Sequence, residues 1–199
     1  PALMDALVVV ANPNPASYGH ALAAAAADGL GAAGHTVTLL DLYADRFVAA
    51  MTAAERHAYH TSEPILDPQV AASAELVQRC EILVFVYPTW WSGLPAILKG
   101  WLDRVLVPGV GFVFNARGKV RPGLTHVRRI VGISTYGSPW FVTKLINDNG
   151  RRMLTRTLRV STGLRARPTW LALYSMDSAS DEDRTAFLDE IEQRMTELT

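Results

Sequence analysis

Residues 81–106 read EILVFVYPTWWSGLPAILKGWLDRVL and contain a strand, a loop and a helix in succession. Residues 81–87 predict the clearest central strand of the chain, and within them residues 82–86 form its longest clean apolar run. Such a run, without polar alternation, is typical of a strand buried on both faces of a parallel sheet. Pro95 stands at a favoured first helical position and predicts a helix over residues 96–106. The tryptophans of the loop between them, Trp90 and Trp91, are expected to pack or to bind a ligand.

The same alternation of strand and helix continues in both directions along the chain. Strands are expected at residues 6–11, 36–42, 129–134 and 169–174, helices at 20–33, 69–80, 141–158 and 180–198, and a loop at 109–122. Five such units predict an α/β fold, a doubly wound parallel sheet with helices on both faces. Since no repeat or linker interrupts them, we expect one domain over residues 1–199. Residues 43–68 form an insertion after the second strand, in which Thr52 and Glu55 predict a capped short helix.

Composition narrows the classes of function. The 199 residues are 49% apolar and carry 19 basic and 19 acidic side chains, which argues against a nucleic-acid binder and against disorder. The single cysteine, Cys80, excludes an intrachain disulfide and a thiolate metal cluster and favours a reducing cytoplasm. No stretch approaches the roughly 18 apolar residues of a membrane span, and the first residues lack a signal-peptide pattern. We therefore expect a cytoplasmic protein with no metal and no membrane span.

The charge is unevenly distributed. Residues 117–167 carry twelve basic side chains and one acidic side chain. One hypothesis is that this segment attracts a phosphorylated cofactor, through Arg117, Lys119, Arg121, Arg128 and Arg129. The alternative is a solvated surface that is partly ion-paired.

Ligands of doubly wound sheets bind at the carboxyl ends of the strands, near the point where the strand order reverses. That rule selects three loops, at residues 12–19, 88–94 and 134–140. The first loop ends in Ser17, Tyr18 and Gly19 at a helix N-terminus, where free amides and the helix dipole favour an anion. Alternatively, Ser17 only caps the helix. The loop contains neither G-x-G-x-x-G nor G-x-x-x-x-G-K-[ST], which argues against a Rossmann fingerprint and a P-loop.

The other two loops are rich in aromatic and hydroxyl groups. Trp90 and Trp91 offer an aromatic platform, and Gly93 permits close approach to the backbone. Residues 134–140 supply hydroxyls, a glycine and two aromatic rings. The alternatives are that the indoles seal the strand end or a subunit interface, and that residues 134–140 form an ordinary turn. Together the three loops describe a site for a ligand with a phosphate and a flat heteroaromatic ring, and a flavin fits this description.

Three segments carry a resemblance to a known family. Residues 88–104 resemble the signature stretch of the flavodoxin-like NAD(P)H:quinone oxidoreductases, which runs aromatic-Pro-x-x-Trp-aromatic-x-x-Pro-Ala-hydrophobic-Leu-Lys-Gly-Trp. Residues 12–18 are similar to the phosphate loop of that family, and residues 134–137 to its Thr-Thr-Gly-Gly turn. The resemblance implies a flavodoxin-like sheet of order 2-1-3-4-5 and a homodimer with a flavin at the subunit interface.

The resemblance also implies an activity and a set of flavin contacts. The family reduces quinones and related acceptors with NADH or NADPH by a ping-pong mechanism. FAD is favoured by the chain length and the insertion, while FMN, the choice of NADH or NADPH, and the acceptor stay open. The implied contacts are Asn12, Ser17, Tyr18 and Gly19 for the phosphate; Pro88, Thr89, Trp90 and Trp91 for the isoalloxazine ring; and Ser134, Thr135, Tyr136 and Gly137 for its other polar edge.

The chain departs from the family pattern at several positions. Asn12 stands where the family often has His, Gly19 where it often has Asn, and Tyr136 in place of a glycine. The Tyr and His that the better-known quinone reductases carry downstream have no counterpart in residues 141–149. Tyr136 is therefore the candidate for proton handling, with Trp140 as a pocket wall. Two other functions stay open: a regulatory ancillary subunit of a potassium efflux system, and a flavodoxin-like electron carrier, although such carriers are usually strongly acidic.

Overall fold

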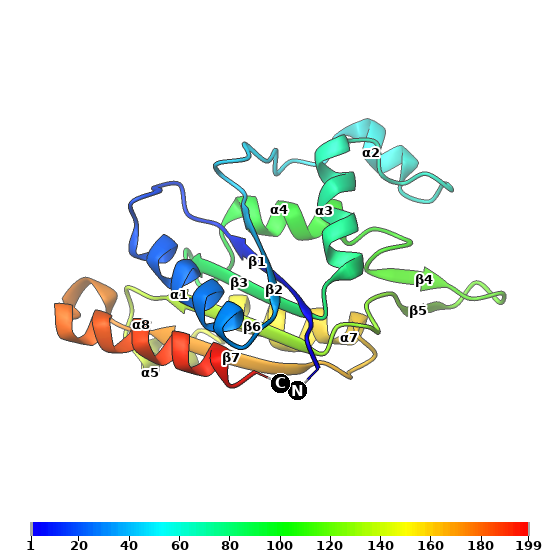
Figure 1. Cartoon of the computed structure of the whole chain (residues 1–199). Coiled ribbons are helices and arrows are strands. Elements are labelled where there is room, and N and C mark those ends of the chain that lie inside the picture. Colours follow the sequence, from blue (N-terminus) through cyan, green and yellow to red (C-terminus); the bar gives the residue numbers. More distant parts are fainter. Residues whose placement is uncertain (1, 199) are drawn as a thin grey trace.

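A five-stranded parallel sheet forms the centre of the protein. The computed structural model describes residues 2–198. The sheet consists of β1 (Asp5–Val10), β2 (Thr36–Asp41), β3 (Ile82–Pro88), β6 (Arg129–Thr135) and β7 (Arg167–Leu173), in the order β2-β1-β3-β6-β7 (Figure 1). Counted along the parallel strands, this is the expected order 2-1-3-4-5. It makes β1, β3 and β6 neighbours, so that the loops that follow these three strands lie at one edge.

Helices cover both faces of the sheet (Figure 1). One face carries α1 (Tyr18–Ala32) and α8 (Asp181–Thr196), and the other carries α3 (Pro68–Arg79), α4 (Ala96–Val105) and the π-helix η1 (Met153–Leu158). Successive side chains of a strand point to opposite faces. Val8 accordingly packs in the α1 and α8 layer, whereas Leu7 and Val9 pack in the other layer. Both faces of the central strands are buried, which explains their apolar sequences.

The last helix, α8, begins with a capping box. The Ser180 side chain accepts a hydrogen bond from the amide of Asp183, and the Asp183 side chain accepts one from the amide of Ser180. A close approach holds α8 against α1. A Cβ atom on Gly29 would lie 2.3 Å from the carbonyl oxygen of Glu192, so the two helices would have to separate to admit a side chain there.

The insertion between β2 and α3 is anchored by a buried arginine. Its helix α2 (Ala53–Ala58) begins with the predicted capping box of Thr52 and Glu55. Arg104 of α4 is only 4% exposed and donates to Glu55 Oε1 and to Asp67 Oδ2, the latter at 2.7 Å. Since Glu55 belongs to the insertion and Asp67 caps α3, one guanidinium ties three segments together.

Two predictions about secondary structure were wrong. Residues 109–122, expected to be a loop, contain the antiparallel hairpin of β4 (Phe112–Phe114) and β5 (Val120–Pro122), which projects from the body (Figure 1). The single helix expected at residues 141–158 is divided into α5 (Trp140–Leu145), α6 (Asn149–Arg152) and η1, and α7 (Arg159–Ser161) follows. Asn147 and Asp148 separate α5 from α6 because both have positive φ angles, 76° and 41°.

The remaining elements agree with the sequence to within a few residues. A 3-10 turn η2 (Met176–Ser178) connects β7 to α8. Within residues 2–198, no helix has both the length and the apolar character that crossing a membrane requires. The single cysteine, Cys80, is buried, and burial raises its pKa to about 12.

Candidate active site

The first loop presents free amides at the start of α1. Ser17 caps the helix, because its side chain accepts from the amide of His20, and its hydroxyl also contacts His20 Nδ1 at 3.0 Å. Within residues 2–198, the amides of Tyr18 and Gly19 make no hydrogen bond. Free amides at the positive end of a fifteen-residue helix favour an anion such as a phosphate. Ser17 therefore acts as a cap and leaves the two amides after it available.

The side chains of the loop shape it rather than point outward. Asn12 Oδ1 accepts from the amide of Asn14, and Asn14 Oδ1 accepts from the amide of Ala16, each at 3.0 Å. The hydroxyl of Tyr18 donates to the carbonyl oxygen of Arg184 at 2.7 Å, and burial raises the pKa of Tyr18 to about 12. Only the backbone of Tyr18 is thus available to a ligand.

The second and third loops are joined by hydrogen bonds. The amide of Thr89 donates to the carbonyl of Thr135 at 2.9 Å, and the Thr89 and Ser134 hydroxyls lie 2.8 Å apart. Ser134 is fully buried, and its hydroxyl also donates to the carbonyl of Tyr87 at 2.9 Å. The Ser134 side chain therefore positions Thr89 instead of facing a ligand. Pro88 and Thr135 are the last residues of β3 and β6.

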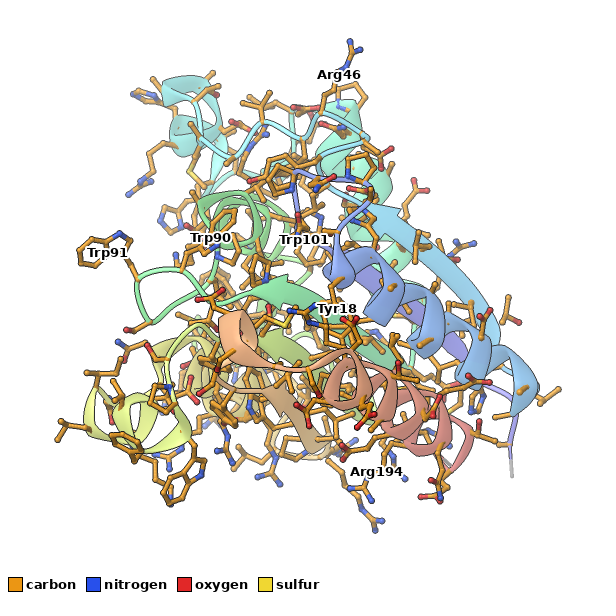
Figure 2. All side chains as sticks on the ribbon, turned by 90° about the vertical axis from the view of Figure 1, so that its left-hand side faces the viewer. Tyr18, Arg46, Trp90, Trp91, Trp101 and Arg194 are labelled. Atoms are coloured by element: carbon orange, nitrogen blue, oxygen red, sulfur yellow. The ribbon has the colours of Figure 1, made fainter. Side chains whose placement is uncertain are left out.

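The two tryptophans after β3 do not seal the strand end. Trp90 is 45% exposed and Trp91 is fully exposed. Figure 2 shows the indole of Trp91 pointing away from the body of the protein. Trp91 and Ser92 both have positive φ angles, 48° and 57°, which are uncommon for residues with a Cβ atom and recur at functional sites. The loop is therefore held in an unusual conformation that exposes an aromatic side chain.

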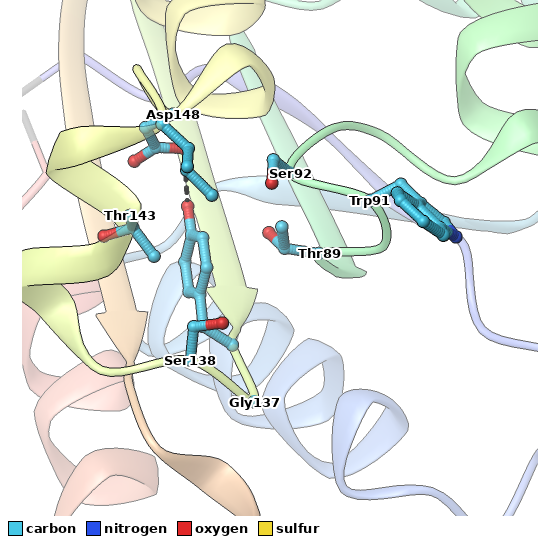
Figure 3. A pocket seen from close by; sticks show the side chains of 9 residues that line it. Thr89, Trp91, Ser92, Gly137, Ser138, Thr143 and Asp148 are labelled. Carbon is cyan, nitrogen blue, oxygen red and sulfur yellow. Dashed lines mark hydrogen bonds between the residues drawn. The ribbon is translucent and has the colours of Figure 1, made fainter.

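A cavity of about 270 Å³ lies between the second and third loops (Figure 3). Its lining residues are Thr89, Trp91, Ser92, Tyr136, Gly137, Ser138, Thr143, Ile146 and Asp148. Trp91 borders the cavity, but its indole is directed away from it. The cavity thus joins two of the three predicted loops with the segment between α5 and α6.

Tyr136 and Asp148 form a hydrogen-bonded pair in the wall of this cavity. The Tyr136 hydroxyl donates to Asp148 Oδ1 at 2.9 Å, the interaction drawn as a dashed line in Figure 3. Tyr136 is only 3% exposed, and its ring stacks on Tyr174 with centroids 4.8 Å apart. Burial, reinforced by the charge of Asp148, raises the pKa of Tyr136 far above its ordinary value. The phenol consequently keeps its proton and acts as a hydrogen-bond donor.

Asp148 was not among the residues predicted from the sequence. A signal was present, since Asp148 is the one acidic residue of segment 117–167. The prediction of a continuous helix over residues 141–158 hid the position of Asp148 at the break between α5 and α6. Trp140, predicted as a wall of the same pocket, lies in α5 beside a second hollow, where it is 53% exposed.

The cationic residues suggested by the sequence lie away from this edge. Arg128 and Arg129 are at the amino end of β6, whereas the cavity adjoins its carboxyl end. Arg128 pairs with Glu81 at 2.9 Å. These two residues therefore lie at the opposite end of the strand from the cavity, and their contact with a cofactor phosphate stays a prediction. Arg121 lies in the projecting β5, and Arg117 and Lys119 in the turn that precedes it.

A parallel sheet of this order, with its candidate ligand loops at the carboxyl edge, defines a flavodoxin-like protein. Comparison with known proteins gives the same class, because residues 4–197 match the family model described as "Flavodoxin-like fold". The ribosyldihydronicotinamide dehydrogenase [quinone] of Pongo abelii is 31% identical over 165 residues, which cover 74% of this chain and 71% of that protein. The chain belongs to the flavodoxin-like quinone oxidoreductase family.

Other relatives extend the comparison. NAD(P)H dehydrogenase [quinone] 1 of Cavia porcellus is 29% identical over 152 residues, which cover 69% of this chain. The aligned part spans 55% of that protein, so this chain corresponds to about half its length. The NAD(P)H:quinone oxidoreductase from Methanothermobacter marburgensis superposes with a TM-score of 0.85 at 25% identity, and all of both chains is covered.

Proposed function

We propose that this protein is a flavin-dependent NAD(P)H oxidoreductase that passes a hydride from NAD(P)H, by way of the flavin, to a quinone or a similar acceptor. The observation that carries the proposal is the shared position of two features. The free amides of α1 and the cavity beside Tyr136 lie at the same edge of the sheet, on either side of the loop after β3. Two of its relatives are named as quinone dehydrogenases, and these names support the same activity.

The donor groups at this edge fit a flavin. The amides of Tyr18 and Gly19 suit its phosphate. The amides of Gly137 and Ser138 make no hydrogen bond within the described residues and border the cavity, where they suit the polar edge of the ring. We propose FAD as the flavin, and FMN is the alternative because it would use the same two groups of amides.

A bound flavin supplies the capacity to accept a hydride and to pass it on. The chain contributes orientation and charge stabilisation. Fixed amides beside the ring stabilise negative charge that develops there, without needing to reorganise. The Tyr136 hydroxyl, kept neutral by burial, holds a proton at the cavity wall, and Asp148 fixes its direction. Since one cavity serves the donor and the acceptor, we infer that the donor leaves before the acceptor binds.

We further propose that a second copy of the chain covers the apolar surface beside the cavity. Trp91, Phe141, Leu145 and Ile146 are all at least 40% exposed. Grouped exposed apolar side chains of this kind usually mark an interface. Sedimentation velocity would show a dimer, and a monomer at all accessible concentrations would contradict this part of the proposal. The single buried thiol, Cys80, accords with a protein of the reducing cytoplasm.

The activity is tested by adding FAD or FMN to the purified protein, recording the visible spectrum, and then adding NADPH or NADH without oxygen. We expect tight binding of one flavin and bleaching of its absorption by a dinucleotide. Addition of a quinone should restore the absorption. Flavin binding without bleaching by either dinucleotide would favour a carrier or a regulatory subunit, and no flavin binding would overturn the proposal.

A further inference from the structure

A second hollow, of about 250 Å³, adjoins the first cavity and shares Thr143 and Asp148 with it. Its other walls come from α5, α6, η1 and the residue that follows β7. Four of its lining residues are basic: Lys144, Arg151, Arg152 and Arg156. We call this group the basic hollow.

The positive charge of the basic hollow is not neutralised by the protein. Asp148 is the one acidic residue among those that line it, and its carboxylate accepts from the Tyr136 hydroxyl and the amide of Arg151. Within residues 2–198, the side chains of the four basic residues form no ion pair or hydrogen bond. The Lys144 ammonium lies 4.1 Å from the centroid of the Trp140 ring.

Several other cations of the chain have a carboxylate partner. Lys99, Arg104, Arg128 and Arg184 each pair with a carboxylate. Four like charges around one concavity repel one another, and a concave wall concentrates their field. An anion that enters the hollow relieves this repulsion. Guanidinium groups match the geometry of phosphate oxygens, with two parallel hydrogen bonds for each pair.

We propose that the basic hollow binds the phosphate groups of the dinucleotide hydride donor. This inference rests on the proposed function, because it assumes that the nicotinamide ring enters the first cavity. In NAD(P)H the pyrophosphate is joined to the nicotinamide through a single ribose. A donor with its ring in the first cavity can therefore place its phosphates in the adjoining hollow, past Thr143 and Asp148.

The position of the hollow separates these phosphates from those of the flavin. The free amides that suit the flavin phosphate follow β1, which is separated from β6 by β3. The basic hollow is built from the segments that follow β6 and from Tyr174, which follows β7. The flavin phosphate and the donor phosphates are thus assigned to opposite sides of the first cavity.

The test measures binding of ADP and of 2′,5′-ADP, which contain the phosphates but no nicotinamide, to the flavin-loaded protein. Calorimetry reports binding without turnover. The variant R151Q/R156Q removes two cations of the hollow. The control R165Q/R167Q removes two exposed arginines from a second basic surface, at the amino ends of β6 and β7. Both variants alter the net charge equally, and thermal unfolding checks that both fold.

We expect R151Q/R156Q to weaken binding of at least one probe by about tenfold or more, since it removes two charge-assisted partners of the phosphate oxygens. The control should bind like the wild type. Tighter binding of 2′,5′-ADP than of ADP would assign the hollow to the 2′-phosphate, and tighter binding of ADP would assign it to the pyrophosphate. Unchanged affinity in R151Q/R156Q, or equal loss in the control, would overturn the inference.

The two proposals fail separately. If the protein binds the probes at the hollow but neither NADPH nor NADH reduces its flavin, the phosphate site stands and the oxidoreductase activity is wrong. If NADPH reduces the flavin with the same KM in the wild type and in R151Q/R156Q, the oxidoreductase activity stands and the phosphate site is wrong.

Discussion

The side-chain nitrogen of Asn12 lies 3.1 Å from the point that a Cβ atom on residue 19 would occupy. The two positions at which the phosphate loop departs from its family are therefore in contact. Asn12 also accepts the amide of Asn14 at 3.0 Å, so its side chain holds the loop in shape. Gly19 leaves room for that arrangement, and the two departures form one structural unit.

The first prediction tests this unit. Gly19→Ala should displace the Asn12 side chain and weaken flavin binding by several-fold, because the free amides at the start of α1 shift with the loop. Flavin titration measures the change. The matched control is Gly31→Ala in the same helix, where an added Cβ meets nothing within 4 Å. That variant should keep its flavin affinity and gain about 0.5–1 kcal/mol of stability. Equal flavin affinity in both variants would contradict the prediction.

The second prediction concerns Tyr136. Tyr136→Phe removes the hydroxyl that donates to Asp148 but keeps the ring that stacks on Tyr174. We expect acceptor turnover to fall by about 100-fold or more, the range for loss of one hydrogen-bond donor to developing negative charge, while flavin affinity stays within a few-fold. Steady-state kinetics and flavin titration measure the two effects. An unchanged turnover number would show that the Tyr136 hydroxyl has no part in the reaction.

The third prediction concerns acid stability. Burial on its own raises the pKa of Glu55, but hydrogen bonds from Thr52 and Arg104 outweigh it and leave the pKa below the usual value. For Asp67, the hydrogen bond from Arg104 is the main cause of a lowered pKa. A lowered carboxyl pKa gives stability that is complete above the ordinary value, near pH 4, and is lost as the pH falls through the folded-state value. The melting temperature should therefore fall steeply below about pH 4.

A variant checks the source of that stability. Arg104→Gln leaves two carboxylates without their buried partner and should cost roughly 3–5 kcal/mol at pH 7. The melting temperature of this variant should also depend less on pH below about pH 4 than that of the wild type. Lys99→Gln breaks only the exposed pair with Asp103 and should cost about 0–1 kcal/mol. Similar losses in the two variants would contradict the assignment of the acid sensitivity to Arg104.

The edge of the sheet that carries the site could be predicted from the sequence because buried parallel strands have a simple signature. Residues 82–87 are apolar on both faces of their strand. The place of this strand among the other strand and helix units determines which loops meet. The wall of the cavity could not be predicted in this way. Asn147 and Asp148 interrupt an otherwise helical pattern through positive φ angles, a conformation that Asn and Asp adopt more readily than most residues. The local signal, Asn-Asp-Asn-Gly at residues 147–150, was masked by the helical pattern on either side of it. Asp148 and the basic hollow were missed for that reason.

The last prediction concerns Tyr87, the residue before the second loop. Its hydroxyl is buried and has no hydrogen-bond partner within the described residues. It lies against the backbone at Gly150, where an added Cβ would be 3.1 Å away. An unsatisfied buried hydroxyl costs roughly 1–3 kcal/mol, so Tyr87→Phe should raise the free energy of unfolding by an amount in that range. Denaturant unfolding measures the gain, and turnover should stay unchanged because Tyr87 does not line the cavity. A less stable variant would mean that the hydroxyl is satisfied in solution, and a stabilised variant with impaired turnover would place Tyr87 in the proton path with Tyr136.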